Sequence, residues 1–165
     1  MRKIALFLAM SVSAMADAAG EIPAALQPSA GQQAFASAHA QGVQIYQCNL
    51  QQGQAVWEFI GPEAVLYDAN GLAIGKHYAG PTWEAADGSR VVGNVIAKVD
   101  KLPGQAIPWL LLAVAGHEGT GAWTHSLAIQ RIHTQGGLPP VSGCDGNHLG
   151  DEERVAYQAD YVFFK

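Results

Sequence analysis

His77 is the residue in this sequence that is best placed to take part in chemistry. It lies in the stretch IGKHYAGPTWEAADGS, residues 74–89. On an extended strand its own face would carry only small side chains, those of Ala73, Gly75 and Ala79. This leaves room around the imidazole that something else must fill.

Two pairings of the strands on either side of Gly80-Pro81 would give His77 different neighbours. A connecting loop with an even number of residues places His77 opposite Glu84, whereas a three-residue loop places it opposite Trp83. The first pairing would raise the pKa of His77 and form a proton-transfer unit near neutral pH, and the second would give a stacked histidine. Both remain open, because Pro is disfavoured at the second central position of a tight turn.

An enzyme is one function that such a site would support. Its candidate catalytic residues are His77, Glu84 and Asp87, with His77 and one carboxylate as an acid–base pair. The sequence contains no G-x-G-x-x-G after a strand, no P-loop and no G-x-S-x-G. Dinucleotide chemistry, P-loop chemistry and an α/β-hydrolase nucleophile are therefore unsupported, and we expect no cofactor.

A binding module is the function that we favour from the sequence. Aromatic side chains on several predicted strands could line a pocket near His77 for a small molecule or a glycan. The candidate ligand-binding residues are Trp83, Tyr78 and Trp57. A third alternative is an envelope-associated structural or interaction protein, for which an exposed apolar patch without a concave pocket would be expected.

Six histidines invite a metal hypothesis: His39, His77, His117, His125, His133 and His148. No two of them are spaced as H-x-H or H-x-x-x-H, so a metal site would need ligands from different strands. The turn-like segments at residues 87–89 and 145–147 carry too few acids for a calcium loop. We therefore predict no metal site.

The elements that must position these residues are strands. Apolar stretches separated by glycines predict strands at residues 43–48, 56–60, 64–67, 73–78, 83–86, 90–99, 109–115, 124–134 and 154–164. Such a chain forms an antiparallel sandwich or a closed barrel, and the sequence leaves both open. Residues 32–40 are rich in Ala and free of Pro, so a helix is an alternative there.

Two of these strands have informative patterns. In the last strand the alternating residues Val155, Tyr157, Ala159, Tyr161 and Phe163 should form a core face. Residues 109–115 are apolar on both faces, which is typical of a strand that is covered on each side.

The N-terminus indicates export. Arg2 and Lys3 precede the apolar run 4–10 and small residues at positions 13, 14 and 16, the pattern of a signal peptide over residues 1–16, with cleavage between 16 and 19. We expect a secreted or periplasmic protein with an extended arm over residues 17–34. Residues 35–165 would form a single all-β domain.

Charge and cysteine content limit the partners and the compartment. Without residues 1–16, seven Lys and Arg face 14 Asp and Glu, a net charge of −7 that disfavours nucleic acid. The only other long apolar stretch, residues 107–116, is too short for a membrane span. Cys48 and Cys144 should form one disulfide in an oxidising compartment, since a redox or metal pair would need closer spacing. The oligomeric state is left open.

The ordered motifs GVQIYQC, WEFIGPEA, LYDANG, IGKHYAGPTWEAADGSRVVG and IPWLLL, with the late TQGG and second cysteine, resemble the domain-of-unknown-function family 3455. This family consists of small exported proteins of bacteria and fungi, and the resemblance covers nearly the whole mature chain. It implies that the export signal, the Cys48–Cys144 link and the motif around His77, Pro81, Trp83 and Asp87 belong to the family pattern. It implies no particular activity.

Overall fold

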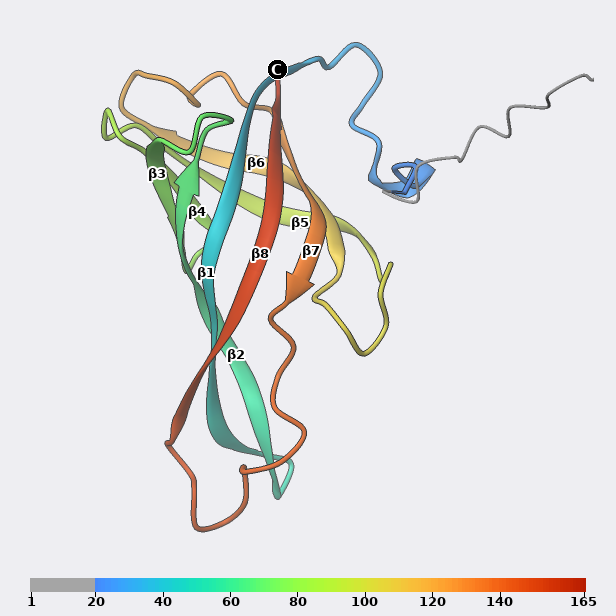
Figure 1. The fold of residues 1–165 in the computed structure, drawn as a ribbon, viewed down its shortest axis with the longest axis vertical. Helices are drawn as coiled ribbons and strands as arrows, with labels where there is room; N and C mark the ends of the chain where they lie inside the picture. The colour runs from blue at the N-terminus through green and yellow to red at the C-terminus, as the bar shows by residue number, and fades with distance from the viewer. Residues whose placement is uncertain (1–19) are drawn as a thin grey trace, which may run out of the picture.

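The chain folds into a closed barrel of antiparallel strands. The computed structural model describes residues 20–165, so the predicted signal peptide lies outside the described residues. The elements are η1 (Ala24–Leu26), β1 (Ala34–Gln51), β2 (Gln54–Tyr67), β3 (Ala73–Tyr78), β4 (Thr82–Ala85), β5 (Arg90–Val99), β6 (Trp109–Glu118), β7 (Ala128–Gly136) and β8 (Glu152–Phe164). Each strand pairs with the next and β8 pairs with β1 (Figure 1). The all-β prediction is confirmed, and the barrel form is selected because closure removes exposed sheet edges.

Several strand boundaries differ from the prediction. The helix alternative for residues 32–40 is wrong, because β1 begins at Ala34 and its small residues Ala38 and Ala40 face the core while His39 faces outward. The two strands predicted at residues 56–60 and 64–67 are one strand, β2. A β-bulge lies just before Gly61, so the glycine and the following proline mark an irregularity within a strand rather than its end.

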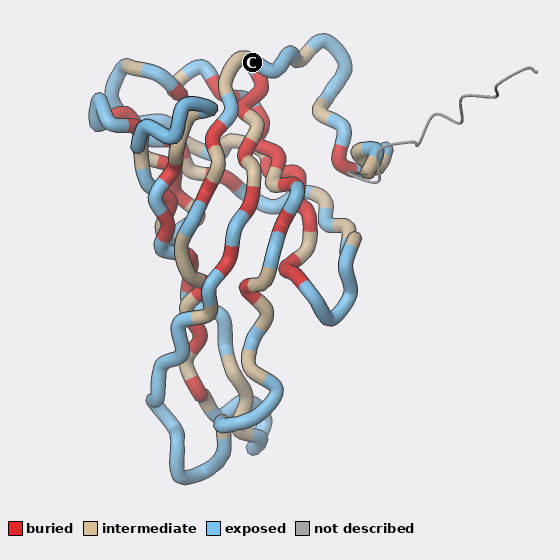
Figure 2. The backbone as a smooth tube through the Cα atoms, in the orientation of Figure 1, coloured by how far each residue is buried: buried red, intermediate tan, exposed pale blue. Residues whose placement is uncertain are grey.

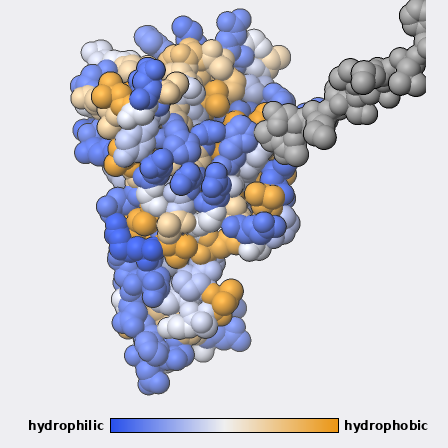
Figure 3. Space-filling model, in the orientation of Figure 1, coloured by the Kyte–Doolittle hydropathy of each residue, from blue (hydrophilic) through white to orange (hydrophobic). Residues whose placement is uncertain are grey.

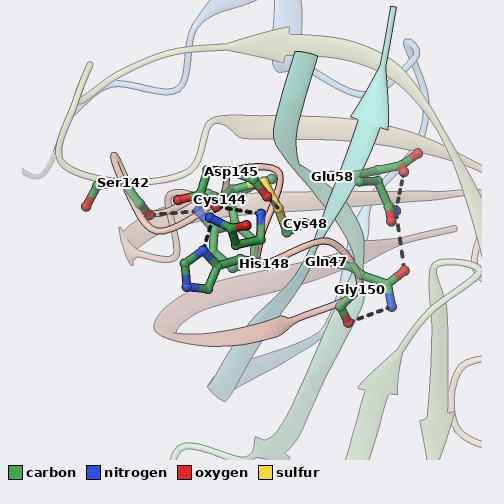
Figure 4. The surroundings of a disulfide bond; sticks show 11 residues. Gln47, Cys48, Glu58, Ser142, Cys144, Asp145, His148 and Gly150 are labelled. Atoms are coloured by element: carbon green, nitrogen blue, oxygen red, sulfur yellow. Dashed lines mark hydrogen bonds and ion pairs between the residues drawn. A yellow bond between two sulfur atoms is a disulfide. The ribbon is translucent and has the colours of Figure 1, made fainter. Parts of the chain in front are cut away.

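The strands β1, β2 and β8 are long and continue beyond the barrel body as a narrow extension (Figure 1). The extension is largely exposed, whereas buried residues concentrate in the barrel (Figure 2). The predicted disulfide between Cys48 and Cys144 ties β1 to the segment that precedes β8 (Figure 4). Nearby, the indole Nε1–H of Trp57 donates a hydrogen bond to the carbonyl oxygen of Ser142 at 2.9 Å.

The segment before β1 packs against the outside of the barrel. Leu26 of η1 is fully buried in a cluster with Trp109 and Leu111 of β6, and the side-chain amide of Gln130 donates to the Leu26 carbonyl oxygen at 2.6 Å. Leu112, on the other face of β6, lies in the barrel interior. The prediction that this strand is covered on each side is therefore confirmed for residues 109–112, where η1 supplies part of the outer cover, whereas Ala113 and Val114 are partly buried and Ala115 is exposed.

One end of the barrel interior is filled by aromatic packing. Trp123, from the β6–β7 loop, stacks on Phe163 with ring centroids 4.8 Å apart. Phe163 belongs to the predicted core face of β8, on which Tyr157, Ala159 and Tyr161 are also buried. Val155, at the extension, is only half-buried. This end of the barrel is closed, so any internal space lies toward the other end.

The surface is mixed in character. On the face drawn in Figure 3, hydrophobic residues are exposed around the middle of the molecule, and hydrophilic residues cover much of the extension. No helix within residues 20–165 has the length and hydropathy needed to cross a membrane.

Candidate functional site

A cavity of about 310 Å³ occupies the end of the barrel opposite Trp123, beside the β3–β4 turn. His77, Trp83 and Tyr161 form its inner wall, and all three side chains are buried. Phe59, Ile60 and Val95 also line it and are about half exposed, at 50%, 48% and 53%. The cavity therefore reaches the surface at an apolar rim, and its volume is at the low end of the range for small-molecule pockets.

Two β-bulges shape this rim. In β2, Ile45 and Tyr46 pair with Gly61 and Phe59, which leaves Ile60 as the extra residue. In β5 the register skips Ile96 in the same way. A bulge changes the direction in which neighbouring side chains point, and bulges are common beside functional sites. Here both of them place large apolar side chains at the surface next to the cavity.

The β3–β4 register decides between the two predicted neighbours of His77. Tyr78 pairs with Thr82 across a three-residue loop, so His77 lies opposite Trp83. The two rings stack with centroids 4.3 Å apart and an angle of 17° between their planes. Tyr161 meets His77 edge-on at 5.0 Å. The stacked-histidine alternative is the one that the protein adopts.

His77 is neutral in this setting. Its Nδ1 lies 2.8 Å from the carbonyl oxygen of Thr82, so Nδ1 carries the proton and donates it. Burial lowers the pKa of His77 to about 3, the hydrogen bond to Thr82 opposes that change, and the charge of Arg131 lowers the pKa further. The imidazole therefore carries no charge near neutral pH, and Nε2 is left as an acceptor.

The carboxylates proposed as catalytic partners lie elsewhere. Glu84 pairs with Lys76 in the register and accepts a hydrogen bond from the Tyr78 hydroxyl at 2.8 Å. This hydrogen bond lowers the pKa of Glu84, and Lys76 at 3.2 Å adds to the effect. The three-residue loop puts Glu84 one position away from His77 and so on the opposite face of the sheet. The predicted pair of His77 with Glu84 is not formed.

Asp87 has a structural position at the closed end of the barrel. It accepts hydrogen bonds from the backbone N–H groups of Ser89 and Ala122, each at 2.9 Å, and so links the β4–β5 turn to the β6–β7 loop. The Ser89 hydrogen bonds lower the pKa of Asp87. Because the cavity is at the other end, Asp87 is not brought together with His77.

Of the three predicted ligand-binding aromatics, only Trp83 lines the cavity with His77. Tyr78 points to the outer surface, where it contacts Glu84. Trp57 lies on the extension near the disulfide. The alternation of side chains along a strand explains the position of Tyr78, since neighbours in sequence face opposite sides.

Sequence reasoning missed Arg131 and the role of Tyr161, which the barrel brings to this cavity. The Nε and Nη2 atoms of Arg131 donate to the carbonyl oxygen of Pro108 at 3.1 and 2.8 Å. Within residues 20–165, no carboxylate forms an ion pair with this guanidinium. The sequence did offer one signal. Ile129 and Arg131 are two residues apart on β7 and therefore point to the same face of the sheet, and Ile129 faces the core.

One buried donor of the inner wall, the indole Nε1–H of Trp83, has no partner among the described residues. The Tyr161 hydroxyl lies beside Tyr157 and Arg131. Burial raises the pKa of Tyr161, and the charge of Arg131 and hydrogen bonds from these two side chains oppose the change, so the hydroxyl keeps its proton at neutral pH. Buried donors normally have a partner, so the Trp83 indole N–H is available to a hydrogen-bond acceptor in the cavity.

Four of the histidines outside the cavity, His39, His117, His133 and His148, contact carboxylates or backbone. His39 and His133 place Nδ1 2.8 Å from the two carboxylate oxygens of Asp160, and His148 does the same with Asp145 near the disulfide (Figure 4). In the described part of the chain, no group of three His, Cys, Asp or Glu side chains is arranged to hold a metal ion.

The fold and the cavity define a class of protein: an up-and-down, eight-stranded barrel with an internal cavity that opens at one end. The chain belongs to the family described as "Protein of unknown function (DUF3455)", which matches residues 28–165. This confirms the resemblance seen in the sequence. No curated protein and no solved structure matches the chain significantly.

Proposed function

We propose that the protein binds a small molecule in the barrel cavity. The observation that carries the proposal is a cavity with an apolar rim whose inner wall holds polar groups, among them the unpartnered indole Nε1–H of Trp83 and the guanidinium of Arg131. Ligand pockets combine mostly apolar walls with a few polar groups in this way. Of the two ligand classes expected from the sequence, a small apolar molecule fits better than a glycan, since Phe59, Ile60 and Val95 line the entrance.

The other two functions have less support. An acid–base enzyme would need a proton partner for His77, and the His77 ring donates its hydrogen bond to the Thr82 carbonyl rather than to a carboxylate. A purely structural or interaction protein would be expected to lack a concave pocket, whereas a cavity is present here. We therefore favour binding.

A matched pair of tryptophan substitutions tests the proposal. Val95→Trp should block the entrance, because Val95 is a half-exposed residue of the rim. Val65→Trp is the control, since Val65 is 41% exposed on β2 and does not line the cavity. We expect a thermal-shift screen of small apolar compounds to yield binders, with affinity reduced at least about tenfold by Val95→Trp and unchanged by Val65→Trp.

Two outcomes would contradict the proposal. One is a screen in which no compound stabilises the protein, since a ligand at about 100 times its Kd should add about 2.7 kcal/mol to the free energy of unfolding. The other is a set of binders that are indifferent to Val95→Trp, because their site would lie outside the cavity.

We also propose that the protein acts outside the cytoplasm. The support is the disulfide between Cys48 and Cys144, a bond that persists in oxidising compartments, together with the signal-like residues 1–16. Mass spectrometry of the protein from the producing cell should find it in the periplasm or the medium, shortened by 16 to 19 residues. A full-length, cytoplasmic protein with reduced thiols would contradict this proposal.

A further inference from the structure

We propose that the ligand of the barrel cavity is an amphiphile with an anionic, carboxylate-type head and an apolar tail, with Arg131 as the residue that receives the head. This inference rests on the proposed binding function and specifies its ligand class. It goes beyond that function because many apolar molecules without a charged head would also fit a cavity with an apolar rim.

Arg131 is the first support, because its charge lacks a partner of opposite sign. The guanidinium lines the cavity from β7 and is partly buried. Two of its nitrogens, Nε and Nη2, donate to the single carbonyl oxygen of Pro108, and the guanidinium also lies beside the Tyr161 hydroxyl, whose pKa is raised by burial and lowered by this guanidinium. A guanidinium has five N–H donors and matches a carboxylate in geometry, so this one retains donors that a ligand could use.

The second support is the character of the other polar groups on the inner wall. Trp83 and Tyr161 are each 1% exposed, and the Nε1–H of Trp83 can only donate. His77 already uses its one proton on the Thr82 carbonyl. Together with Arg131, the wall thus offers more donors than acceptors, the acceptors being Nε2 of His77 and the Tyr161 oxygen, and it carries one positive charge. A carboxylate, which only accepts hydrogen bonds, complements this set, whereas an ammonium head would be repelled.

The surroundings of the cavity are consistent with this assignment. Gln44, whose side-chain amide nitrogen is buried without a partner among the described residues, and Tyr157 do not line this cavity. No acidic side chain from residues 20–165 lines it either, so none of them neutralises the charge of Arg131 from within the cavity walls.

The apolar residues at the rim of the cavity are the evidence that the ligand has an apolar tail. Phe59, Ile60 and Val95 line the cavity and are also about half exposed at the surface. Ile96, the extra residue of the β5 bulge next to Val95, is 61% exposed. An acyl chain that packs on this surface would remove apolar area from water on both sides. The cavity volume of about 310 Å³ favours a head and a short tail inside, with a longer tail lying across the rim.

Three probes with the same tail test the head group. Decanoate and decylammonium, each below its micelle concentration, and decanol, below its solubility limit, are titrated into the full mature protein at pH 7.5 and followed by calorimetry. We expect decanoate to bind about tenfold or more tightly than decanol, because hydrogen bonds to a charged group are the stronger ones, and decylammonium to bind more weakly than either.

Arginine substitutions show which residue produces the preference. Arg131→Gln should weaken decanoate binding about tenfold or more and leave decanol binding within about twofold. Arg131→Lys should retain part of the preference, since it keeps the charge but not the planar fork. Arg154→Gln is the matched control, because Arg154 forms ion pairs with Glu63 and Glu152 away from the cavity. It should change neither affinity.

The outcomes separate this inference from the proposed function. If decanol binds as tightly as decanoate, the head-group assignment is overturned while binding in the cavity stands. If none of the three probes binds but another compound binds and its binding is weakened by Val95→Trp, the head-group assignment is again overturned, while binding in the cavity stands. If nothing binds, both proposals fall. If Arg131→Gln does not fold, the affinities of the wild-type protein for the three probes and those of Arg131→Lys still test the head-group assignment.

Discussion

His77 illustrates how one buried side chain can be charged in the unfolded chain and neutral in the folded protein. Its ring is held between Trp83, on which it stacks, and the carbonyl of Thr82, to which it donates. Burial lowers its pKa to about 3, whereas an exposed histidine titrates near 6.5. This residue therefore links stability to pH.

The first prediction concerns that link. As the pH falls below about 6.5, the unfolded chain takes up a proton at His77 that the folded protein does not accept until about pH 3, so stability falls across this window. Between pH 7.5 and 5 the loss from His77 amounts to about 2 kcal/mol. Urea unfolding at the two pH values measures it.

The control is His77→Gln, which cannot titrate. The variant can be less stable at every pH, because it loses the ring stacking, but its stability should fall about 2 kcal/mol less than that of the wild type between the two pH values. Equal pH dependence in the two proteins would show that His77 is not held neutral by the fold.

At the residue scale, the sequence predicted the small neighbours of His77 and both of its candidate partners. It did not decide between them, because the choice depends on whether Ala79, Gly80 and Pro81 form a three-residue loop, and Gly-Pro is compatible with more than one loop length. Arg131 was missed because a lone cation on a strand normally faces water. Only the closed barrel shows that its side chain lines a cavity.

At the element scale, η1 extends the hydrophobic core to the outside of the barrel. Leu26 is fully buried against Trp109 and Leu111, and Gln130 holds its carbonyl in place. Sequence reasoning placed an extended arm here and also recognised that the strand over residues 109–115 must be covered on each side. It did not connect the two, because a single leucine in a stretch rich in Ala, Gln and Pro gives little periodicity to read.

The second prediction tests this contact. Leu26→Ala should lower the free energy of unfolding by about 2–5 kcal/mol, the usual cost of removing a fully buried leucine side chain. Leu72→Ala is the control, since Leu72 lies in the β2–β3 turn and is 66% exposed. It should change stability by no more than about 0.5 kcal/mol. If the two variants were equally stable, the segment before β1 would not be part of the core.

The strand boundaries show a similar limit of sequence reasoning. Gly61 and Pro62 suggested a break between two short strands, but the chain passes through them as one strand with a bulge. Both readings follow from the same residue types, because glycine and proline occur in turns and also at bulges. The bulge matters for the site, since it brings Phe59 and Ile60 to the rim together.

At the scale of the whole molecule, the barrel is closed at one end and hollow at the other. Trp123 and Phe163 fill the first end, and Asp87 ties two of its loops together. At the second end the inner wall keeps the Trp83 indole N–H without a partner among residues 20–165. The sequence predicted an all-β domain with one disulfide, but it could not predict a cavity, because a cavity depends on how side chains from seven strands, β2 to β8, meet after closure.

The four tryptophan indoles allow the central claim to be tested in one experiment. Trp83 lines the cavity with an unpartnered Nε1–H, whereas Trp57 donates to Ser142 on the extension and Trp123 packs at the closed end. A two-dimensional ¹⁵N–¹H spectrum resolves an indole signal for each, and a Trp83→Phe variant assigns the one that matters. We expect decanoate, or the best compound of the screen, to shift the Trp83 indole signal in a saturable manner and to leave those of Trp57 and Trp123 in place. A ligand that binds without moving the Trp83 signal would contradict the account.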